Sequence, residues 1–296
     1  MKIGAVYPQT ELGGDPAALG RIGRAVESLG YDHLLMYDHV VGAVHENRHP
    51  PLLNGPYTDR HPFHDPFTSF GYLAGITQRL ELVTGVIILP QRQTVLVAKQ
   101  AAEVDLLSGE RLRLGVGAGW NYVEYEALGQ DFTTRGARLT EQIDFLRRLW
   151  AEPLVSFEGR FDRIDRGNIL PRPRRRIPIW CGGYTEPAYR RAARQADGFL
   201  FGGSVKGVLK GWTFLQQLLR ENGRDVSSFG AEYIQNALSG AFDLDSAVDG
   251  ACRWKEAGGT HVTVVSMGHG FTTVEQHLDF FARARERFVA ALGPGS

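Results

Sequence analysis

An aspartate and a histidine stand together at the end of a short apolar segment. Asp38 and His39 follow residues 33–37, which have the composition of a buried strand. An imidazole at a strand end can donate a hydrogen bond to a carbonyl or a ring nitrogen, or transfer a proton near neutral pH. The neighbouring carboxylate can accept hydrogen bonds from a cofactor or fix the loop. We therefore take the pair as the best catalytic candidate, with the alternative that both residues only cap the following turn.

A glycine-rich segment leaves another predicted strand. Ser108-Gly109 ends a helix, residues 111–116 form the strand, and Gly115, Gly117 and Gly119 lead to Trp120. Glycine removes the side chain where a flat ligand approaches the backbone. Tight packing alone also produces Gly-x-Gly-x-Gly turns, so the segment predicts a cofactor site only together with other features.

Two glycine pairs follow later strands. Gly182-Gly183 is followed by Thr185 in the capping position of a helix and Pro187 in its first turn. Free backbone N–H groups at a helix start attract a phosphate through hydrogen bonds and the helix dipole. Gly202-Gly203 repeats the pattern after the next strand. The pairs predict a phosphate site, with loop formation as the alternative.

Histidines are concentrated in the segment after the second strand, at positions 45, 49, 61 and 64. Their spacing is irregular and no His-x-His leaves the first strand, so we predict no metal site. We expect solvated loop residues, of which His61 and His64 are the candidates to line a substrate. The sequence also contains no Gly-x-Ser-x-Gly elbow and no Walker-type loop, which excludes the common serine hydrolase and nucleoside triphosphatase designs.

Short strands alternate with amphipathic helices along the whole chain, which is typical of parallel βα units. Eight strand and helix pairs predict an α/β fold, a (β/α)8 TIM barrel formed by residues 1–296 as one domain. A doubly wound sheet would show fewer strands and one dominant phosphate loop. The predicted strands are residues 2–7, 33–37, 80–89, 111–116, 177–181, 198–201, 231–240 and 261–266, and the predicted helices are residues 16–29, 67–78, 94–107, 134–150, 186–196, 205–222, 244–257 and 273–291.

Two long insertions interrupt this alternation, one after strand 2 and one before strand 5. Residues 40–66 belong on the C-terminal face, where barrel enzymes keep their active sites, and are the candidate substrate lid. Residues 153–173 form the second insertion and read as a long loop.

Composition limits the partners and the compartment. The 33 Lys and Arg residues balance the 33 Asp and Glu residues, so we expect neither nucleic acid nor an anionic membrane surface as a partner. No segment has the roughly 20 uninterrupted apolar residues of a membrane span. With only two cysteines and no signal-like start, the chain is expected in the cytoplasm.

Several of these segments together resemble the bacterial luciferase-like superfamily of flavin and deazaflavin oxidoreductases, and most closely its coenzyme F420-dependent branch. The resemblance runs in the family's order from residue 1 to about residue 290. It is carried by Tyr37-Asp38-His39, by residues 82–93, 98–109 and 115–120, and by residues 179–183 followed by Ala196-Asp197-Gly198.

The resemblance implies a barrel that holds an isoalloxazine-type ring at its C-terminal mouth. By carry-over, Asp38 and His39 flank the reactive edge, Ala118-Gly119 meet the ring or the ribityl chain, and Gly182-Gly183 hold the phosphate. The family's bulge, with a cis non-prolyl bond supporting the ring, matches Thr84, Gly85 and Val86. The resemblance also favours a homodimer.

Trp120 departs from one branch of the superfamily. Sugar-phosphate dehydrogenases of this superfamily carry a carboxylic acid directly after the glycine run, where this chain has Trp120. This argues against an acid-assisted sugar dehydrogenase. Trp120 is expected either to wall the cofactor or substrate, which favours a hydrophobic, unsaturated or carbonyl-bearing substrate, or simply to close the barrel mouth.

The leading hypothesis from the sequence is therefore coenzyme F420-dependent hydride transfer to or from a small organic substrate, with His39 stabilising or protonating the developing anion. An FMN-dependent monooxygenase that uses oxygen has nearly the same sequence pattern, because the two cofactors share ring, ribityl chain and phosphate. A non-catalytic flavin-binding barrel and a metal-dependent barrel hydrolase are the remaining alternatives.

Overall fold

Eight parallel strand positions form a closed barrel in the computed structural model, which describes residues 1–48, 52–235 and 243–293. The order around the barrel is β3-β2-β1-β11-β10-β9-β8-β5, and Leu82 of β3 lies opposite Leu112 of β5 to close it. The predicted TIM barrel is confirmed. Its strands are β1 (Lys2–Val6), β2 (His33–Met36), β3 (Glu81–Thr84), β5 (Leu112–Gly117), β8 (Ile179–Gly182), β9 (Gly198–Gly203), β10 (Gly230–Gln235) and β11 (His261–Val264).

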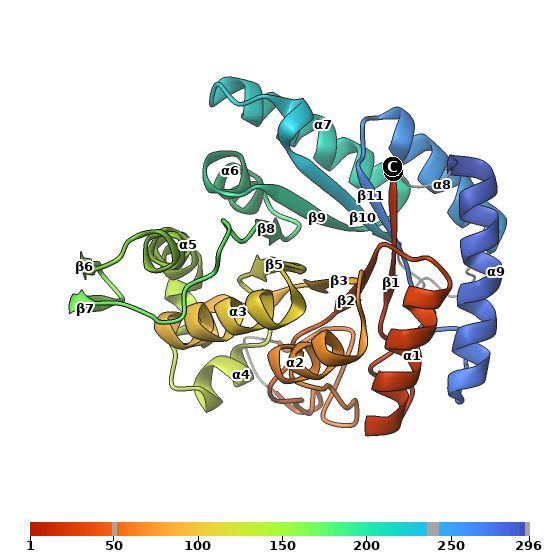
Figure 1. The fold of residues 1–296 in the computed structure, drawn as a ribbon, viewed down its shortest axis with the longest axis horizontal. Coiled ribbons are helices and arrows are strands. Elements are labelled where there is room, and N and C mark those ends of the chain that lie inside the picture. The colour runs from red at the N-terminus through yellow and green to blue at the C-terminus, as the bar shows by residue number, and fades with distance from the viewer. Residues whose placement is uncertain (49–51, 236–242, 294–296) are drawn as a thin grey trace.

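Helices surround the strands as an outer layer (Figure 1). Their buried faces pack against the outward side chains of the strands, and this interface holds the main apolar core. Both faces of the strands are thus covered, which explains their nearly continuous apolar sequences. The helices are α1 (Pro16–Ser28), α2 (Pro66–Ile76), α3 (Thr94–Ser108), α5 (Arg135–Ala151), α6 (Glu186–Gln195), α7 (Val205–Glu221), α8 (Leu244–Glu256) and α9 (Val274–Leu292).

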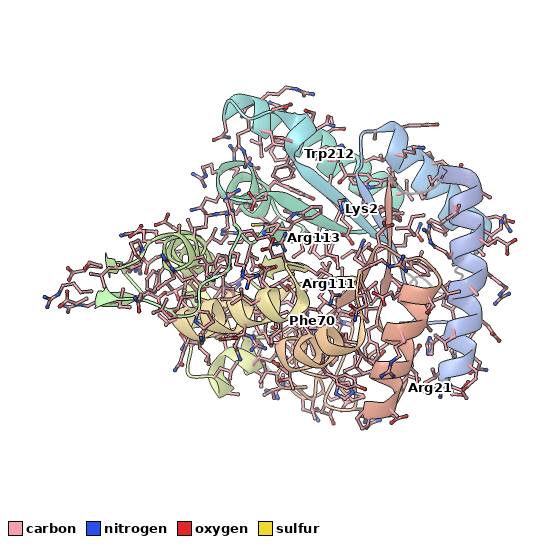
Figure 2. All side chains as sticks on the ribbon, viewed as in Figure 1. Lys2, Arg21, Phe70, Arg111, Arg113 and Trp212 are labelled. Carbon is pink, nitrogen blue, oxygen red and sulfur yellow. The ribbon has the colours of Figure 1, made fainter. Side chains whose placement is uncertain are left out.

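A second, smaller apolar cluster fills the barrel interior around Leu35, Val83, Trp180 and Leu200. Towards the N-terminal ends of the strands the interior is polar. The buried Arg113 is paired with Glu232 and lies 4.2 Å from the centre of the Trp180 ring. Figure 2 labels Arg113 among the strands and Trp212 on α7 outside them. Because side chains fill this end, ligand access is left to the C-terminal ends.

The predicted third strand, residues 80–89, is divided. Its first part is β3, and its continuation β4 (Ile87–Ile88) pairs with β5. Between them the Gly85–Val86 peptide bond is cis, as the family resemblance implied. The predicted strand 231–240 begins as expected in β10, and its residues 236–240 lie outside the described part of the chain.

The insertion before strand 5 contains a hairpin where the sequence predicted only a loop. Strands β6 (Val155–Glu158) and β7 (Arg163–Gly167) pair antiparallel and project beside α5 (Figure 1). Alternation exposes Ser156 and Glu158 while Phe157 stacks on Phe145 of α5, with ring centres 4.4 Å apart. This short period-two pattern is the signal that the loop interpretation missed.

A short helix, α4 (Tyr122–Ala127), also escaped prediction, because six residues are too few to show a helical period. The side chain of Asn121 caps it by accepting a hydrogen bond from the Val123 amide at 3.1 Å. Across the described residues, no helix is both long and apolar enough to cross a membrane.

Candidate active site

The C-terminal ends of the parallel strands meet at one mouth, because all eight run in the same direction. The mouth receives residues 37–39 after β2, residues 118–120 after β5 and residues 183–185 after β8. Residues 40–65, between β2 and α2, contain no regular helix or strand among their described positions. They contact residues at this mouth, where the sequence placed the candidate lid.

One wall of the mouth is built without side chains. Gly117, Gly182 and Gly202 occupy inward-facing positions near the ends of the neighbouring strands β5, β8 and β9. A Cβ at Gly117 would lie 2.5 Å from Val86 Cγ2, and one at Gly182 would lie 2.8 Å from Val86 Cγ1. A Cβ at Gly202 would lie 2.7 Å from the Tyr184 hydroxyl. The three glycines therefore make room for Val86 and Tyr184, whose side chains lie over them at the mouth.

Neighbouring residues of the predicted cofactor set support this wall from behind. The Thr84 hydroxyl donates to the Gly115 carbonyl and accepts from the Gly115 amide, both at 2.8 Å, and is fully buried. The Ala118 carbonyl accepts from the Tyr125 hydroxyl at 2.6 Å. Gly119 has a φ of 64°, and a Cβ there would lie 2.8 Å from Ile88. Gly85 likewise has no room for a Cβ, which would lie 2.3 Å from Leu35.

The two glycine pairs lead into helices with different starts. Gly183 precedes α6, whose N-cap Thr185 makes no side-chain capping bond. Pro187 has no N–H and the Ala188 amide donates to the Thr185 carbonyl at 3.0 Å, so the Glu186 amide is the first-turn donor left for another acceptor. Gly203 precedes α7, where Ser204 accepts from the Gly207 amide at 3.3 Å and caps the helix. Only the first start has the unfilled capping position that a phosphate could use.

Asp38 is buried behind the mouth and its carboxylate is already bound. Arg92 donates from Nη2 to Oδ1 at 2.6 Å and from Nε to Oδ2 at 3.3 Å, and the Ile88 amide donates to Oδ2 at 3.0 Å. Of the roles that the sequence left open for Asp38, these contacts match the fixing of the loop.

His39 is held from one side of its ring. Its Nδ1 lies 3.3 Å from Glu124 Oε2 and also contacts the Tyr57 hydroxyl. The side chain remains 14% exposed, and no described residue hydrogen-bonds its Nε2. One ring nitrogen is thus fixed by protein while the other is available at the mouth.

Glu124, on α4, contacts His39 and was not among the candidates predicted from the sequence. It is buried, and Oε1 accepts hydrogen bonds from the Val40 and Val41 amides at 2.8 and 3.1 Å. Burial alone would raise the pKa of Glu124, but the interactions with His39 and the hydrogen bonds from Val41 and Gln91 outweigh it, so the pKa is lowered. The only local signal was its spacing of three residues from the cap Asn121, as in a capping box.

Trp120 lies beneath the lid. Its ring centre is 5.0 Å from that of Tyr57 and 6.3 Å from that of His39, with both pairs edge to face. A Cβ at Gly55 of the lid would lie 2.1 Å from the Trp120 ring, so only glycine lets the lid backbone pass so close. Trp120 therefore joins the lid to the histidine, and its proposed contact with substrate stays a prediction.

The remaining lid histidines point to different neighbours. His61 Nδ1 accepts from the Thr58 amide at 2.9 Å, whereas the His64 ring packs 6.2 Å from that of Tyr7 at the end of β1. His45 lies against Trp120, and His49 falls outside the described residues. Within the described chain, no three His, Cys, Asp or Glu side chains gather in a way that could hold a metal ion.

A family model and proteins of known sequence match this chain. Residues 2–236 match the model of the luciferase-like monooxygenase family. An uncharacterized protein of Mycobacterium tuberculosis is 34% identical over 246 residues, which cover 82% of this chain and 83% of that one.

Solved structures share the fold. Monooxygenase RslO1 from Streptomyces bottropensis has a TM-score of 0.78 at 19% identity and covers 99% of both chains. An F420-dependent secondary alcohol dehydrogenase, in complex with an F420-acetone adduct, has a TM-score of 0.78 at 16% identity, with 97% of this chain and 98% of that one covered.

Proposed function

The chain belongs to the luciferase-like monooxygenase family and is an oxidoreductase, and from this premise we propose that it catalyses coenzyme F420-dependent hydride transfer to or from a small organic substrate. The observation that carries the proposal is the wall of Gly117, Gly182 and Gly202, on which Val86 packs, together with a histidine whose Nε2 is available.

The residues at the mouth fit a flavin-type or deazaflavin group. The glycine wall and Val86 would meet the flat ring, and the uncapped start of α6 after Gly182-Gly183 would bind the phosphate. When bound, the group would supply the site that accepts or gives up a hydride, chemistry that no amino acid side chain provides.

His39 supplies the proton transfer that accompanies hydride transfer. When a substrate alcohol is oxidised, Nε2 of His39 accepts the hydroxyl proton. The hydride leaves the carbon that carries this hydroxyl, and the C–O group becomes a carbonyl. In the reverse direction Nε2–H donates to the carbonyl oxygen as the hydride arrives. The protein thereby neutralises the charge that develops on the substrate oxygen.

The lid favours small, largely apolar substrates. Tyr57 and Phe63 of the lid form an aromatic cluster with Trp120 and His39, and such surfaces exclude water from the reacting atoms. Glu124 brings a carboxylate near the site although Trp120 follows the glycine run, but that carboxylate is already bound by lid amides and lies on the Nδ1 side of His39. This arrangement supports an alcohol or carbonyl substrate over an acid-assisted sugar dehydrogenase.

The second candidate is an FMN-dependent monooxygenase, favoured by the family to which the chain belongs and by the similarity to a monooxygenase structure. To decide between them, the purified protein is titrated with coenzyme F420 and with FMN separately, and turnover of small alcohols and carbonyls is followed with and without oxygen. We expect F420 binding and oxygen-independent turnover. Tight FMN binding with oxygen-dependent turnover and no F420 binding would replace the proposal, and binding without turnover of either cofactor would point to a non-catalytic barrel.

We also propose a homodimer. Val95 and Leu96 of α3 and Leu170 expose apolar side chains around an open groove of about 640 Å³. Exposed apolar surface of this kind favours association. Light scattering of the wild type and of Leu96→Glu tests this proposal; a monomeric wild type contradicts it.

A further inference from the structure

The buried carboxylate of Glu124 contacts His39, the Val40 and Val41 amides at the start of the lid, and Tyr57 further along the lid. Building on the proposed function, we infer that Glu124 is a positioning residue that fixes the proton of His39 on Nδ1 and so presents Nε2 to the substrate as a proton acceptor. The hydrogen bonds around the two carboxylate oxygens have the directions that this role requires.

The Oε1 atom of Glu124 can only accept hydrogen bonds. The amides of Val40 and Val41, 2.8 and 3.1 Å away, are donors whose direction cannot reverse. They immediately follow His39 in the chain, so the backbone that carries the histidine is held by the same carboxylate. The Val40 and Val41 amides therefore set the orientation of the Glu124 side chain.

Oε2 of Glu124 faces the Gln91 amide, the Tyr57 hydroxyl and the His39 ring. Gln91 Nε2 is 3.3 Å away, the Tyr57 hydroxyl donates at 3.4 Å, and His39 Nδ1 lies at 3.3 Å. Burial, and then the charge of Glu124, raise the pKa of Tyr57, so its hydroxyl keeps its proton and can give it only to an acceptor. Because a carboxylate oxygen can only accept, an Nδ1–H fits the 3.3 Å contact between His39 and Oε2. The Tyr57 oxygen then accepts from the same Nδ1–H while its hydroxyl donates to Oε2.

His39 Nδ1–H is therefore the donor in both hydrogen-bond paths to Glu124. One path runs directly to Oε2, and the other runs through the Tyr57 hydroxyl to Oε2. In the neutral imidazole the lone pair then lies on Nε2, the atom that faces away from these partners. The groups that contact the His39 ring are Glu124 from α4, Tyr57, Phe63 and Trp120, of which Glu124 and Tyr57 are titratable. Asp38, the chain neighbour, is bound by Arg92.

Glutamine at position 124 would reverse this chain of donors. The amide has the shape of the carboxylate, but only its oxygen can accept from the Val40 and Val41 amides. Its NH2 group must then face Tyr57 and His39 as a donor, which leaves Nδ1 as the acceptor and moves the proton to Nε2. Aspartate keeps an acceptor and should keep the proton on Nδ1.

The test uses long-range proton–nitrogen NMR on cofactor-free protein with isotope-labelled histidine, where the two ring nitrogens of each tautomer give different shifts. Loss of one signal set in His39→Gln identifies His39. We expect Nδ1–H in the wild type and in Glu124→Asp, Nε2–H in Glu124→Gln, and the wild-type result in Glu126→Gln, an exposed residue on the same helix. An Nε2–H tautomer in the wild type overturns the inference whether or not any variant folds, and so does an unchanged tautomer in folded Glu124→Gln.

A second readout separates this inference from the proposed function. With cofactor bound, Glu124→Gln should lower kcat by roughly 10- to 100-fold with little change in KM, and Glu124→Asp should recover part of the loss. A change in KM alone overturns the inference. If neither cofactor supports turnover, the proposed function fails while the NMR result on His39 still decides the role of Glu124.

Discussion

Arg92 and Asp38 form a buried ion pair in which the guanidinium engages both carboxylate oxygens. The side chain of Asp38 is 1% exposed and that of Arg92 is 15% exposed. The same Arg92 Nη2 lies 3.4 Å from Asp65, the N-cap of α2, where the lid ends. One arginine therefore ties Asp38, the second residue after β2, to the far end of the lid.

Removing this arginine should be costly. Arg92→Ala leaves the Asp38 carboxylate buried without its cation, and breaking a buried pair in this way typically lowers the free energy of unfolding by about 3–5 kcal/mol. Urea unfolding at neutral pH measures the loss. As a control, Arg253→Ala removes an exposed ion pair on α8 and should cost no more than about 1 kcal/mol. Equal effects in the two variants would contradict a structural role for the Asp38 pair.

His39 is predicted to act in the reaction rather than in binding. His39→Ala should lower kcat by roughly 100- to 10,000-fold, because a positioned proton donor or acceptor is lost. The affinity for the cofactor should remain within about 3-fold, well under the 1.4 kcal/mol that a tenfold change represents. Fluorescence titration and steady-state kinetics test the two halves separately. Undiminished kcat would remove His39 from the mechanism.

The glycine wall predicts a steric effect on cofactor binding. In Gly182→Ala the new methyl would lie 2.8 Å from Val86 Cγ1, so either Val86 shifts or the wall bulges towards the ring. Overpacking of this kind costs roughly 1–3 kcal/mol, and we expect cofactor affinity to fall by about tenfold or more. Gly71→Ala in α2 is the matched control, because its methyl meets nothing within 4 Å. It should leave the affinity unchanged and raise stability by about 0.5–1 kcal/mol.

His277 predicts a pH dependence of stability. Burial, and then the charge of His269, lower the pKa of His277 from 6.5 to about 4 in the folded protein. Between these values the unfolded chain binds a proton that the folded protein does not, so stability falls as the pH is lowered from about 6.5 to about 4.

The loss of stability from this one group is at most about 3–4 kcal/mol. Urea unfolding across this pH window should show a steeper loss in the wild type than in His277→Gln. The comparison concerns the slope with pH, so a uniform destabilisation of the variant leaves it interpretable. Identical slopes in the two proteins would contradict the depressed pKa.

Regular alternation made the barrel predictable. Each barrel strand is buried on both faces and each surrounding helix on one face, so the spacing of apolar residues predicts the eight strand and helix pairs. Their predicted positions match the described elements closely. Gly109, predicted to end α3, does so with a φ of 71°. Short or irregular elements were not recorded in this way, which is why α4 and the hairpin β6–β7 were missed.

The sequence alone predicted only part of the candidate site. Local patterns identified Asp38-His39 and the glycines, because strand ends in a parallel barrel converge on one mouth regardless of detail. They could not indicate that Asp38 turns to Arg92, or that the glycine positions 117, 182 and 202 share one wall, because both depend on which strands become neighbours and which way each residue faces.

The amino-acid sequence by itself thus determined the barrel, the family resemblance and the residues at the strand ends. Only the tertiary structure decided the surroundings of His39. Glu124 lies 85 residues further along the chain, and its approach depends on the closure of the barrel and on the path of the lid. Hydrogen-bond direction is a property of atoms brought together in three dimensions, and no spacing along the chain records it.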